Sequence, residues 1–182
     1  MSALTFRNQT RHIAQFIVKK GQLILARLPG VAPQTEILVP SDEVYTVIAT
    51  TIIDGNTYST APAAVTGAAE FLAQVKQDAQ QGTYEFQMLV ESSPRADQMR
   101  FQKTTIGPVT FTISKNGTPL QSVVVPNSSV TEAVAINDSY SAYAVINGVA
   151  TETVQTPNPN AVITAIVDDT GLDGGYFTLT VA

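Results

Sequence analysis

The chain of 182 residues contains no cysteine, no tryptophan and a single histidine, His12. The missing cysteines exclude disulfides and thiolate metal sites. A catalytic triad or a histidine metal site would have to use His12 alone, and no phosphate-binding glycine loop, nucleophile elbow or zinc spacing occurs. Two carboxylates suffice for glycoside hydrolysis, but no carboxylate pair here has a distinctive setting. We therefore expect a protein that is not an enzyme and holds no cofactor.

Charged residues are scarce, because they make up 14% of the chain against roughly 25% in ordinary soluble domains. The 10 Lys and Arg residues are outnumbered by 15 Asp and Glu residues, which gives a net charge of −5. This balance opposes binding to the phosphates of nucleic acids. A surface with few charges is suited to being covered by other proteins, although many β-rich proteins are simply rich in threonine and serine.

Long apolar runs are also missing. No segment approaches the roughly 18 apolar residues of a membrane-spanning helix, and no amphipathic helix supports membrane insertion. The first residues, MSALTFRNQTRHIAQF, lack the apolar region of a secretory signal. We expect synthesis in the cytoplasm without a signal peptide, and incorporation into a virion or another particle is left open.

The clearest structural signal is the segment from Val109 to Pro126. Apolar and polar residues alternate from Val109 to Ser114, then Asn116 and Gly117 follow, and a second run of β-branched residues comes after them. Alternation with a period of two around an Asn-Gly pair predicts a β-hairpin with a primed turn, in which both central residues take positive φ.

Residues of the first half recur in the second half at spacings of 93 to 96. The recurring residues include Phe6 and Phe101, Phe16 and Phe111, Tyr45 and Tyr140, and the turns Asp54-Gly55 and Asn147-Gly148. Repetition of this kind over the whole length indicates an internal duplication of a module of roughly 90 residues. We expect one module over residues 1–91, a linker over residues 92–98 that contains Pro94, and a second module over residues 99–182.

Each module is predicted to be all-β, because short strands alternate with turns every 8 to 12 residues. The segment Ala69–Gln77 has helical spacing of its apolar residues, but its counterpart in the second module is rich in β-branched residues, so we predict a strand there too. We also expect a strand to end at Leu28, before Pro29, and a single strand over Ala150–Gln155. The predicted fold is two tandem β-sandwich modules of an immunoglobulin-like or related kind.

The best candidate for a metal site is the acidic loop that follows Val167. Asp168, Asp169 and Asp173 lie among glycines there, and their carboxylate oxygens are the ligands that calcium prefers. The spacing differs from that of an EF-hand, and a solvated Asp and Gly turn is the alternative. Tyrosines such as Tyr58 or Tyr143 could stack on a sugar, although such residues are more often partly buried in strands.

Charges of opposite sign gather at the two ends of the sequence. The basic residues before Thr35 are Arg7, Arg11, Lys19, Lys20 and Arg27, with no acidic residue among them, and the segment after Lys115 has acidic residues that include Asp138 and Glu152 but no Lys or Arg. Complementary patches orient association between copies. We therefore expect head-to-tail self-association, with the basic first module of one copy against the acidic second module of the next, and the alternative is that both sets of charges are simply solvated faces.

These observations favour a structural building block or decoration subunit of a larger assembly, such as a phage or phage-like particle or another protein polymer. Its partners would be copies of itself or other proteins of the assembly. The alternative is a lectin-like module that binds a carbohydrate at a cell surface, with a surface glycan as the partner.

Overall fold

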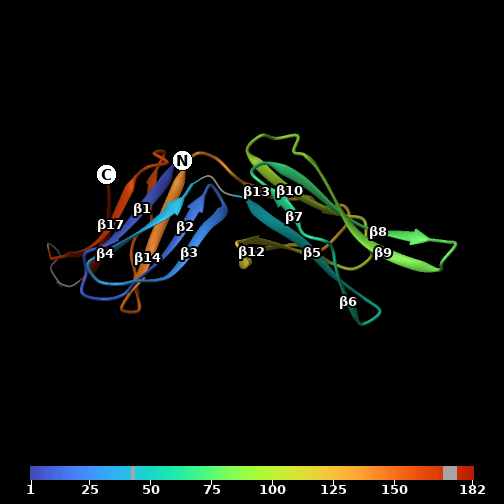
Figure 1. Cartoon of the computed structure of the whole chain (residues 1–182), viewed down its shortest axis with the longest axis horizontal. Helices are drawn as coiled ribbons and strands as arrows, with labels where there is room; N and C mark the ends of the chain where they lie inside the picture. The colour runs from blue at the N-terminus through green and yellow to red at the C-terminus, as the bar shows by residue number, and fades with distance from the viewer. Residues whose placement is uncertain (42–43, 170–175) are drawn as a thin grey trace. The chain divides into compact units, whose positions relative to one another are not determined.

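The computed structural model describes residues 1–41, 44–169 and 176–182 (Figure 1). The regular secondary structure of these residues consists entirely of β-strands, which confirms the prediction of an all-β chain. In this described part of the chain, no helix has the length and apolar character needed to cross a membrane.

The first half of the chain contributes nine strands to the described structure. In chain order they are β1 (Ala3–Asn8), β2 (Ala14–Lys20), β3 (Leu23–Val31), β4 (Thr35–Pro40), β5 (Tyr45–Ile53), β6 (Asn56–Ser59), β7 (Ala63–Val65), β8 (Ala69–Asp78) and β9 (Thr83–Ser92). The prediction of a strand at Ala69–Gln77 is confirmed by β8. The strand prevails over local helix propensity because Phe71 and Ala73 alternate into a core.

The second half contributes nine strands in the same order. They are β10 (Gln98–Lys103), β11 (Val109–Lys115), β12 (Thr118–Val125), β13 (Glu132–Ala135), β14 (Tyr140–Ile146), β15 (Val149–Ala150), β16 (Val154–Thr156), β17 (Val162–Asp168) and β18 (Tyr176–Val181). Matched residues occupy matched strands: Phe16 and Phe111 lie in β2 and β11, and Tyr45 and Tyr140 are the first residues of β5 and β14.

The compact units of the structure are not the two consecutive modules that we expected. Unit 1 consists of Met1–Glu43 together with Asn137–Ala182, and unit 2 consists of Val44–Ile136. Unit 1 therefore combines the first half of one predicted module with the second half of the other. Figure 1 shows this mixture, because the blue strands of the chain start lie among the orange and red strands of the chain end.

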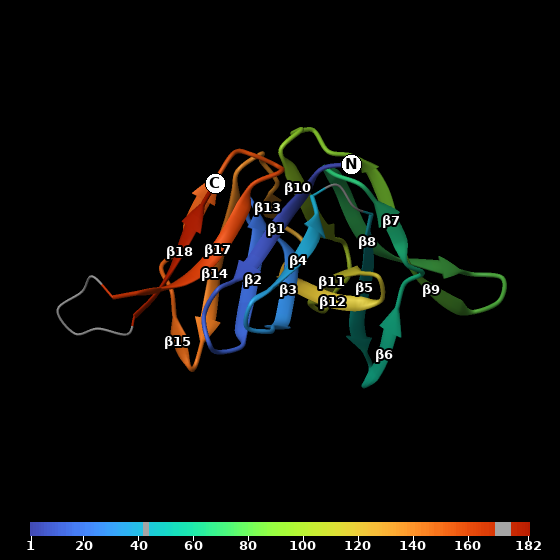
Figure 2. The same cartoon turned by 60° about the vertical axis from the view of Figure 1, so that its left-hand side comes forward.

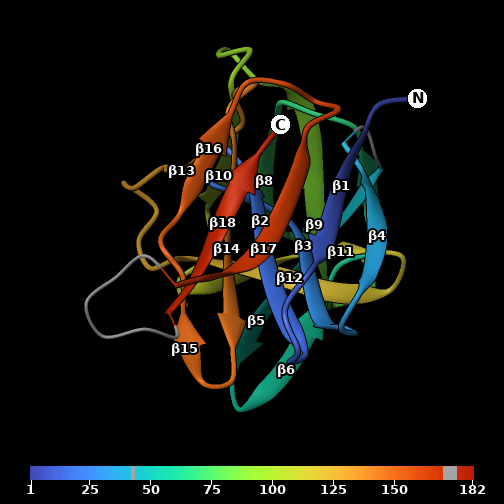
Figure 3. The same ribbon diagram turned by 90° about the vertical axis from the view of Figure 1, so that its left-hand side faces the viewer.

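Unit 1 is built from two sheets. One has the order β18-β17-β1-β4, and the other has the order β15-β14-β2-β3 with β16 also paired to β14. Figures 2 and 3 show β18, β17, β1 and β4 side by side in this order. Strands β1 and β2 come from the start of the chain, whereas their neighbours β17 and β14 come from its end.

Unit 2 repeats the arrangement with the matching strands. Its sheets have the orders β9-β8-β10-β13 and β6-β5-β11-β12, and β7 also pairs with β5. In each unit one strand pair is parallel, namely β1 with β17 and β8 with β10. These parallel pairs distinguish both sandwiches from the immunoglobulin sandwich, whose sheets are antiparallel.

Phenylalanines join the two sheets within each unit. Phe6 of β1 and Phe16 of β2 have ring centroids 5.2 Å apart in unit 1, and the matching Phe101 and Phe111 are 5.0 Å apart in unit 2. All four side chains are fully buried. Because side chains alternate across a strand, every second residue of β1, β2, β10 and β11 faces such a core.

The predicted hairpin turn at Asn116-Gly117 is confirmed. Asn116 and Gly117 have φ values of 51° and 78°, as a primed turn requires. Asp54 and Asn147, each followed by glycine, have φ values of 50° and 51° and connect β5 to β6 and β14 to β15.

Two predicted strand boundaries are wrong. Strand β3 continues through Pro29 to Val31, which is possible because β3 is an edge strand on which a missing N–H need not pair. The single strand expected over Ala150–Gln155 is divided into β15 and β16. The division occurs at Thr151, whose backbone N–H donates to the Ala144 carbonyl while its hydroxyl accepts from the Ala144 N–H at 3.0 Å.

The connector between the fourth and fifth strands is short in both halves of the chain. It is four residues long in both cases, residues 41–44 between β4 and β5 and residues 136–139 between β13 and β14. In unit 1 the two sheets contact each other at their edges. Strand β4 of one sheet contacts β3 of the other, and β18 of the first sheet contacts β14 and β16 of the second. A tandem module would therefore need its connector to run from an edge strand to an inner strand of the other sheet.

The length of that path can be estimated from standard spacings. Two strand spacings of about 4.8 Å and one sheet separation of about 10 Å give a direct line of about 14 Å. Five steps between successive residues reach about 17 Å when fully extended. The connector would therefore be almost fully extended and could not easily pass over the intervening strand. Short, strained connections favour the exchange of structural elements between modules.

We predict that Phe111→Ala lowers the free energy of unfolding of unit 2 by about 3–5 kcal/mol, because it leaves a cavity between the sheets. Thr112→Ala, on the opposite face of β11, should change it by less than about 0.5 kcal/mol. Urea unfolding followed by circular dichroism measures both. Equal effects of the two variants would contradict the assignment of Phe111 to the core.

Candidate functional site

Two hairpins are longer in unit 2 than in unit 1. Strands β5 and β6 have nine and four residues, against seven and two in β14 and β15. Strands β8 and β9 have ten residues each, against seven and six in β17 and β18. The additional residues extend past the neighbouring strands of unit 2 (Figures 1 and 2).

A cavity of about 570 Å³ lies between these extended hairpins and the loop from β10 to β11. This volume is within the roughly 300–1,000 Å³ of typical ligand sites. Its lining is mostly apolar and aromatic with a few polar groups, and consists of Ile52, Ile53, Asp54, Tyr58, Val75, Tyr84, Phe86, Thr104, Thr105, Ile106 and Gly107.

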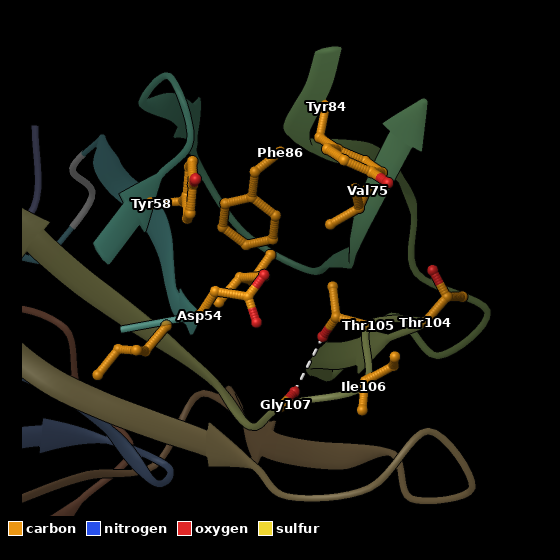
Figure 4. A pocket seen from close by; sticks show the side chains of 11 residues that line it. Asp54, Tyr58, Val75, Tyr84, Phe86, Thr104, Thr105, Ile106 and Gly107 are labelled. Atoms are coloured by element: carbon orange, nitrogen blue, oxygen red, sulfur yellow. Dashed lines mark hydrogen bonds between the residues drawn. The ribbon is translucent and has the colours of Figure 1, made fainter. Parts of the chain in front are cut away.

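Figure 4 shows how the lining residues are arranged. The Phe86 ring lies between Tyr58 of β6 and Val75 of β8, and Asp54 lies below that ring. Thr105, Ile106 and Gly107 face this group from the opposite side. Tyr58 is 40% exposed and Tyr84 is 66% exposed, so both rings are accessible to a ligand.

Hydrogen bonds hold the loop on the far side of the cavity. The Thr105 hydroxyl donates to the Gly107 carbonyl at 2.9 Å, and the buried Lys103 ammonium donates to the Thr105 carbonyl at 2.7 Å. The Thr51 hydroxyl donates to the Pro108 carbonyl at 2.9 Å, which ties the loop to β5. The loop is therefore a fixed wall of the cavity.

The matching position in unit 1 is occupied by a side chain. His12, which corresponds to Gly107, contacts the Phe177 ring edge-on with centroids 5.8 Å apart. Phe177 takes the place of Phe86 in strand register, because it pairs with Val167 of β17 as Phe86 pairs with Val75 of β8. At Gly107 there is no side chain, and a Cβ there would lie only 3.3 Å from the Ile52 carbonyl oxygen. Gly107 and Phe86 thus both line the cavity of unit 2, whereas in unit 1 the His12 ring lies against Phe177.

The side chains that line the cavity are of kinds that can bind a ligand. Aromatic faces offer stacking surfaces, and the carboxylate of Asp54 accepts hydrogen bonds. No histidine or cysteine lines the cavity, so its only ionisable side chains are Asp54 and the two tyrosines. Desolvation by burial lowers the pKa of Lys115, but this residue lies at the end of β11 and does not line the cavity.

The predicted calcium loop is only partly described. Asp168 is the last residue of β17, where it pairs with Tyr176, and Asp169 is exposed. Asp173 lies outside the described residues. Within residues 1–41, 44–169 and 176–182, no group of three acidic or histidine side chains is placed to hold a metal ion.

The residues expected to direct self-association all belong to unit 1. Those residues are Arg7, Arg11, Lys19, Lys20, Arg27, Asp138 and Glu152. The structure brings two of them together, because the Lys20 ammonium lies 3.6 Å from the Asp138 carboxylate. Arg7 instead bonds Glu36 on the adjacent strand at 2.9 Å. The basic and acidic ends of the sequence therefore meet inside one unit and are not the opposite ends of two modules.

Sequence reasoning identified Tyr58 as a possible sugar-stacking residue, and Tyr58 lines the cavity. Tyr143, named with it, lies in the inner strand β14 of unit 1. Tyr84, Phe86 and Asp54 were missed as binding residues. The only available signal was the greater length of both hairpins in the first half.

A comparison of the chain with protein-family models, with curated proteins and with solved structures found no match.

Proposed function

We propose that this chain is a non-enzymatic structural subunit that associates with further copies of itself through the edge strands of its sheets. We also propose that its two units descend from an internal duplication. The matched order of nine strands in each half, with matched phenylalanines and turns, supports the duplication.

The observation that carries the proposal is the placement of exposed apolar residues on edge strands. Leu38 of β4 is 65% exposed and Val124 of β12 is 53% exposed. Strands β12 and β18 are edges without any charged residue. Natural edge strands are usually protected by charges or prolines, and here Pro119 protects only the start of β12.

A second copy is the occupant that fits these edges. An edge strand presents free backbone N–H and C=O groups, and another edge strand satisfies them with a continued ladder. The low charge of the chain, 14% of residues, reduces the electrostatic cost of bringing copies together. Apolar side chains at the edges then supply the affinity.

We expect the wild-type protein to form a defined oligomer or polymer in size-exclusion chromatography with light scattering. Val124→Lys should reduce the mass of this species, because it places a charge on an uncharged edge. Thr112→Lys is the control, since Thr112 lies on β11 of the same sheet, where it pairs with Ser122 of β12 on one side and with Ile48 of β5 on the other. A monomeric wild type, or equal effects of both variants, would reject edge-to-edge association.

A second candidate function is glycan binding in the cavity of unit 2. Tyr58, Tyr84 and Phe86 offer ring faces of the kind that stack on the apolar face of a sugar ring, and Asp54 offers a carboxylate to its hydroxyls. This function is favoured by the exposure of both tyrosines at a cavity of suitable volume.

For glycan binding, we predict that Tyr58→Ala and Tyr84→Ala each weaken the affinity about three- to tenfold, as expected from the loss of one aromatic contact. The measurement is binding to a glycan array, followed by titration of the glycan that binds best. Tyr176→Ala is the control, because Tyr176 is exposed on β18 of unit 1 and does not line the cavity. An equal loss in the control, or no glycan binding by the wild type, would reject this function.

A further inference from the structure

The two units are each assembled from complementary halves. We call residues 1–43 and 93–136 the leading halves and residues 44–92 and 137–182 the trailing halves. Unit 1 joins the first leading half to the last trailing half, and unit 2 joins the remaining two. In each unit a leading half supplies two strands to each sheet, and these strands are completed by strands of the trailing half.

Neither half of unit 1 contains a complete sheet. Strand β2 pairs with β14 over seven residues, from Ala14 with Ile146 to Lys20 with Tyr140. Strand β1 pairs with β17, with Phe6 opposite Ile163. Without residues 137–182, the leading half would expose the apolar faces of β1 and β2. Each half therefore requires a partner half. The same strand contacts can form whether the partner half belongs to the same chain or to another copy.

Charge distinguishes leading from trailing halves. Residues 1–43 carry five basic and three acidic side chains, and residues 93–136 carry four and two, so both leading halves have a net charge of +2. Residues 44–92 carry one basic and five acidic side chains, and residues 137–182 carry five acidic side chains only, which gives −4 and −5. Opposite charges favour the pairing of a leading with a trailing half, and like charges disfavour other pairings.

We infer that copies of this chain exchange halves, so that residues 1–43 of one copy complete a unit with residues 137–182 of the next. This inference rests on the proposed function, because it supplies a route by which the structural subunit polymerises. Unit 2 is continuous in sequence and stays intact in every copy. Two copies that exchange in both directions close into a ring, and copies that exchange in one direction form a filament.

The balance between closed and exchanged forms depends on concentration. In the closed chain the two halves of unit 1 meet at the effective concentration of a tethered pair, which is in the millimolar range for short flexible links. Exchange therefore becomes extensive when folding takes place at about millimolar protein concentration. Dilution before folding favours closed chains.

The absence of cysteine allows a direct test with an engineered disulfide. Ile17 of β2 lies opposite Tyr143 of β14 on one side and opposite Arg27 of β3 on the other. Directly opposed residues of antiparallel strands are about 4.5–5.5 Å apart, within reach of a disulfide. The double variant Ile17→Cys with Tyr143→Cys joins a leading to a trailing half, whereas Ile17→Cys with Arg27→Cys joins two residues of the same half.

Each double variant is unfolded, refolded at about 1 μM or about 1 mM, concentrations on either side of the effective concentration, and then oxidised. The inference predicts covalent dimers and larger species of the Ile17–Tyr143 variant on a denaturing, non-reducing gel, increasing with concentration, and only monomers of the Ile17–Arg27 variant. Monomers alone for both variants at about 1 mM would overturn exchange.

A third variant separates this inference from edge-to-edge association. Adding Val124→Lys to the Ile17–Tyr143 variant removes an edge contact but leaves the complementary halves unchanged. Persistent covalent species with this substitution show that exchange is independent of the edges. If wild-type protein instead forms oligomers while the disulfide stays within single chains, the proposed function holds and exchange is wrong.

Discussion

The four-residue connectors between β4 and β5 and between β13 and β14 are the constraint on which the arrangement of this chain depends. Each half of the chain contains nine strands in the same order, but a tandem sandwich would require its connector to cross from the edge of one sheet to the inside of the other. The estimated path of about 14 Å nearly exhausts the roughly 17 Å reach of such a connector. Pairing halves from different modules keeps all the strand contacts and removes this crossing. The resulting units have equivalent strand orders. Unit 2 is one continuous segment of the chain, whereas unit 1 combines a segment from the start of the chain with a segment from its end.

The same framework permits the two units to differ where their hairpins extend. The cores of both units contain matching phenylalanines. The hydrogen bond from the Ala144 N–H to the Thr151 hydroxyl in unit 1 has a counterpart in unit 2, where the Thr60 hydroxyl accepts from the Ala49 N–H at 3.1 Å. Longer strands and Gly107 open a cavity in unit 2, whereas His12 contacts Phe177 at the matching place in unit 1. The two units thus share packing residues and differ at their hairpin ends, where the cavity of unit 2 lies outside the core.

Most of the strands and turns were predictable from the sequence because they depend on local patterns, whereas the strand boundaries near Pro29 and Thr151 were not. Alternation in β11 and the Asn116-Gly117 pair determine which side chains face the core and where the chain reverses. The pairing of halves was not predictable in this way, because Phe6 and Phe101 have the same pattern and periodicity identifies a buried face but not its partner. Tyr58 was recognised as a candidate, but the cavity also requires Phe86 and Gly107, whose proximity depends on the paired strands. The charge distribution led to a hypothesis of association between copies, whereas the structure places the basic and acidic segments together within unit 1.

The pairing of halves is tested most directly by nuclear Overhauser effects between side chains on adjacent strands. The structure places Val18 opposite Ala142 and Ile113 opposite Val47, and opposed side chains of antiparallel strands lie about 4.5–5.5 Å apart at their Cβ atoms. In protein labelled at valine, isoleucine and alanine methyl groups, we expect cross-peaks between Val18 and Ala142 and between Ile113 and Val47. Two tandem modules would instead give cross-peaks between Val18 and Val47 and between Ile113 and Ala142, and that result would contradict the interleaved arrangement.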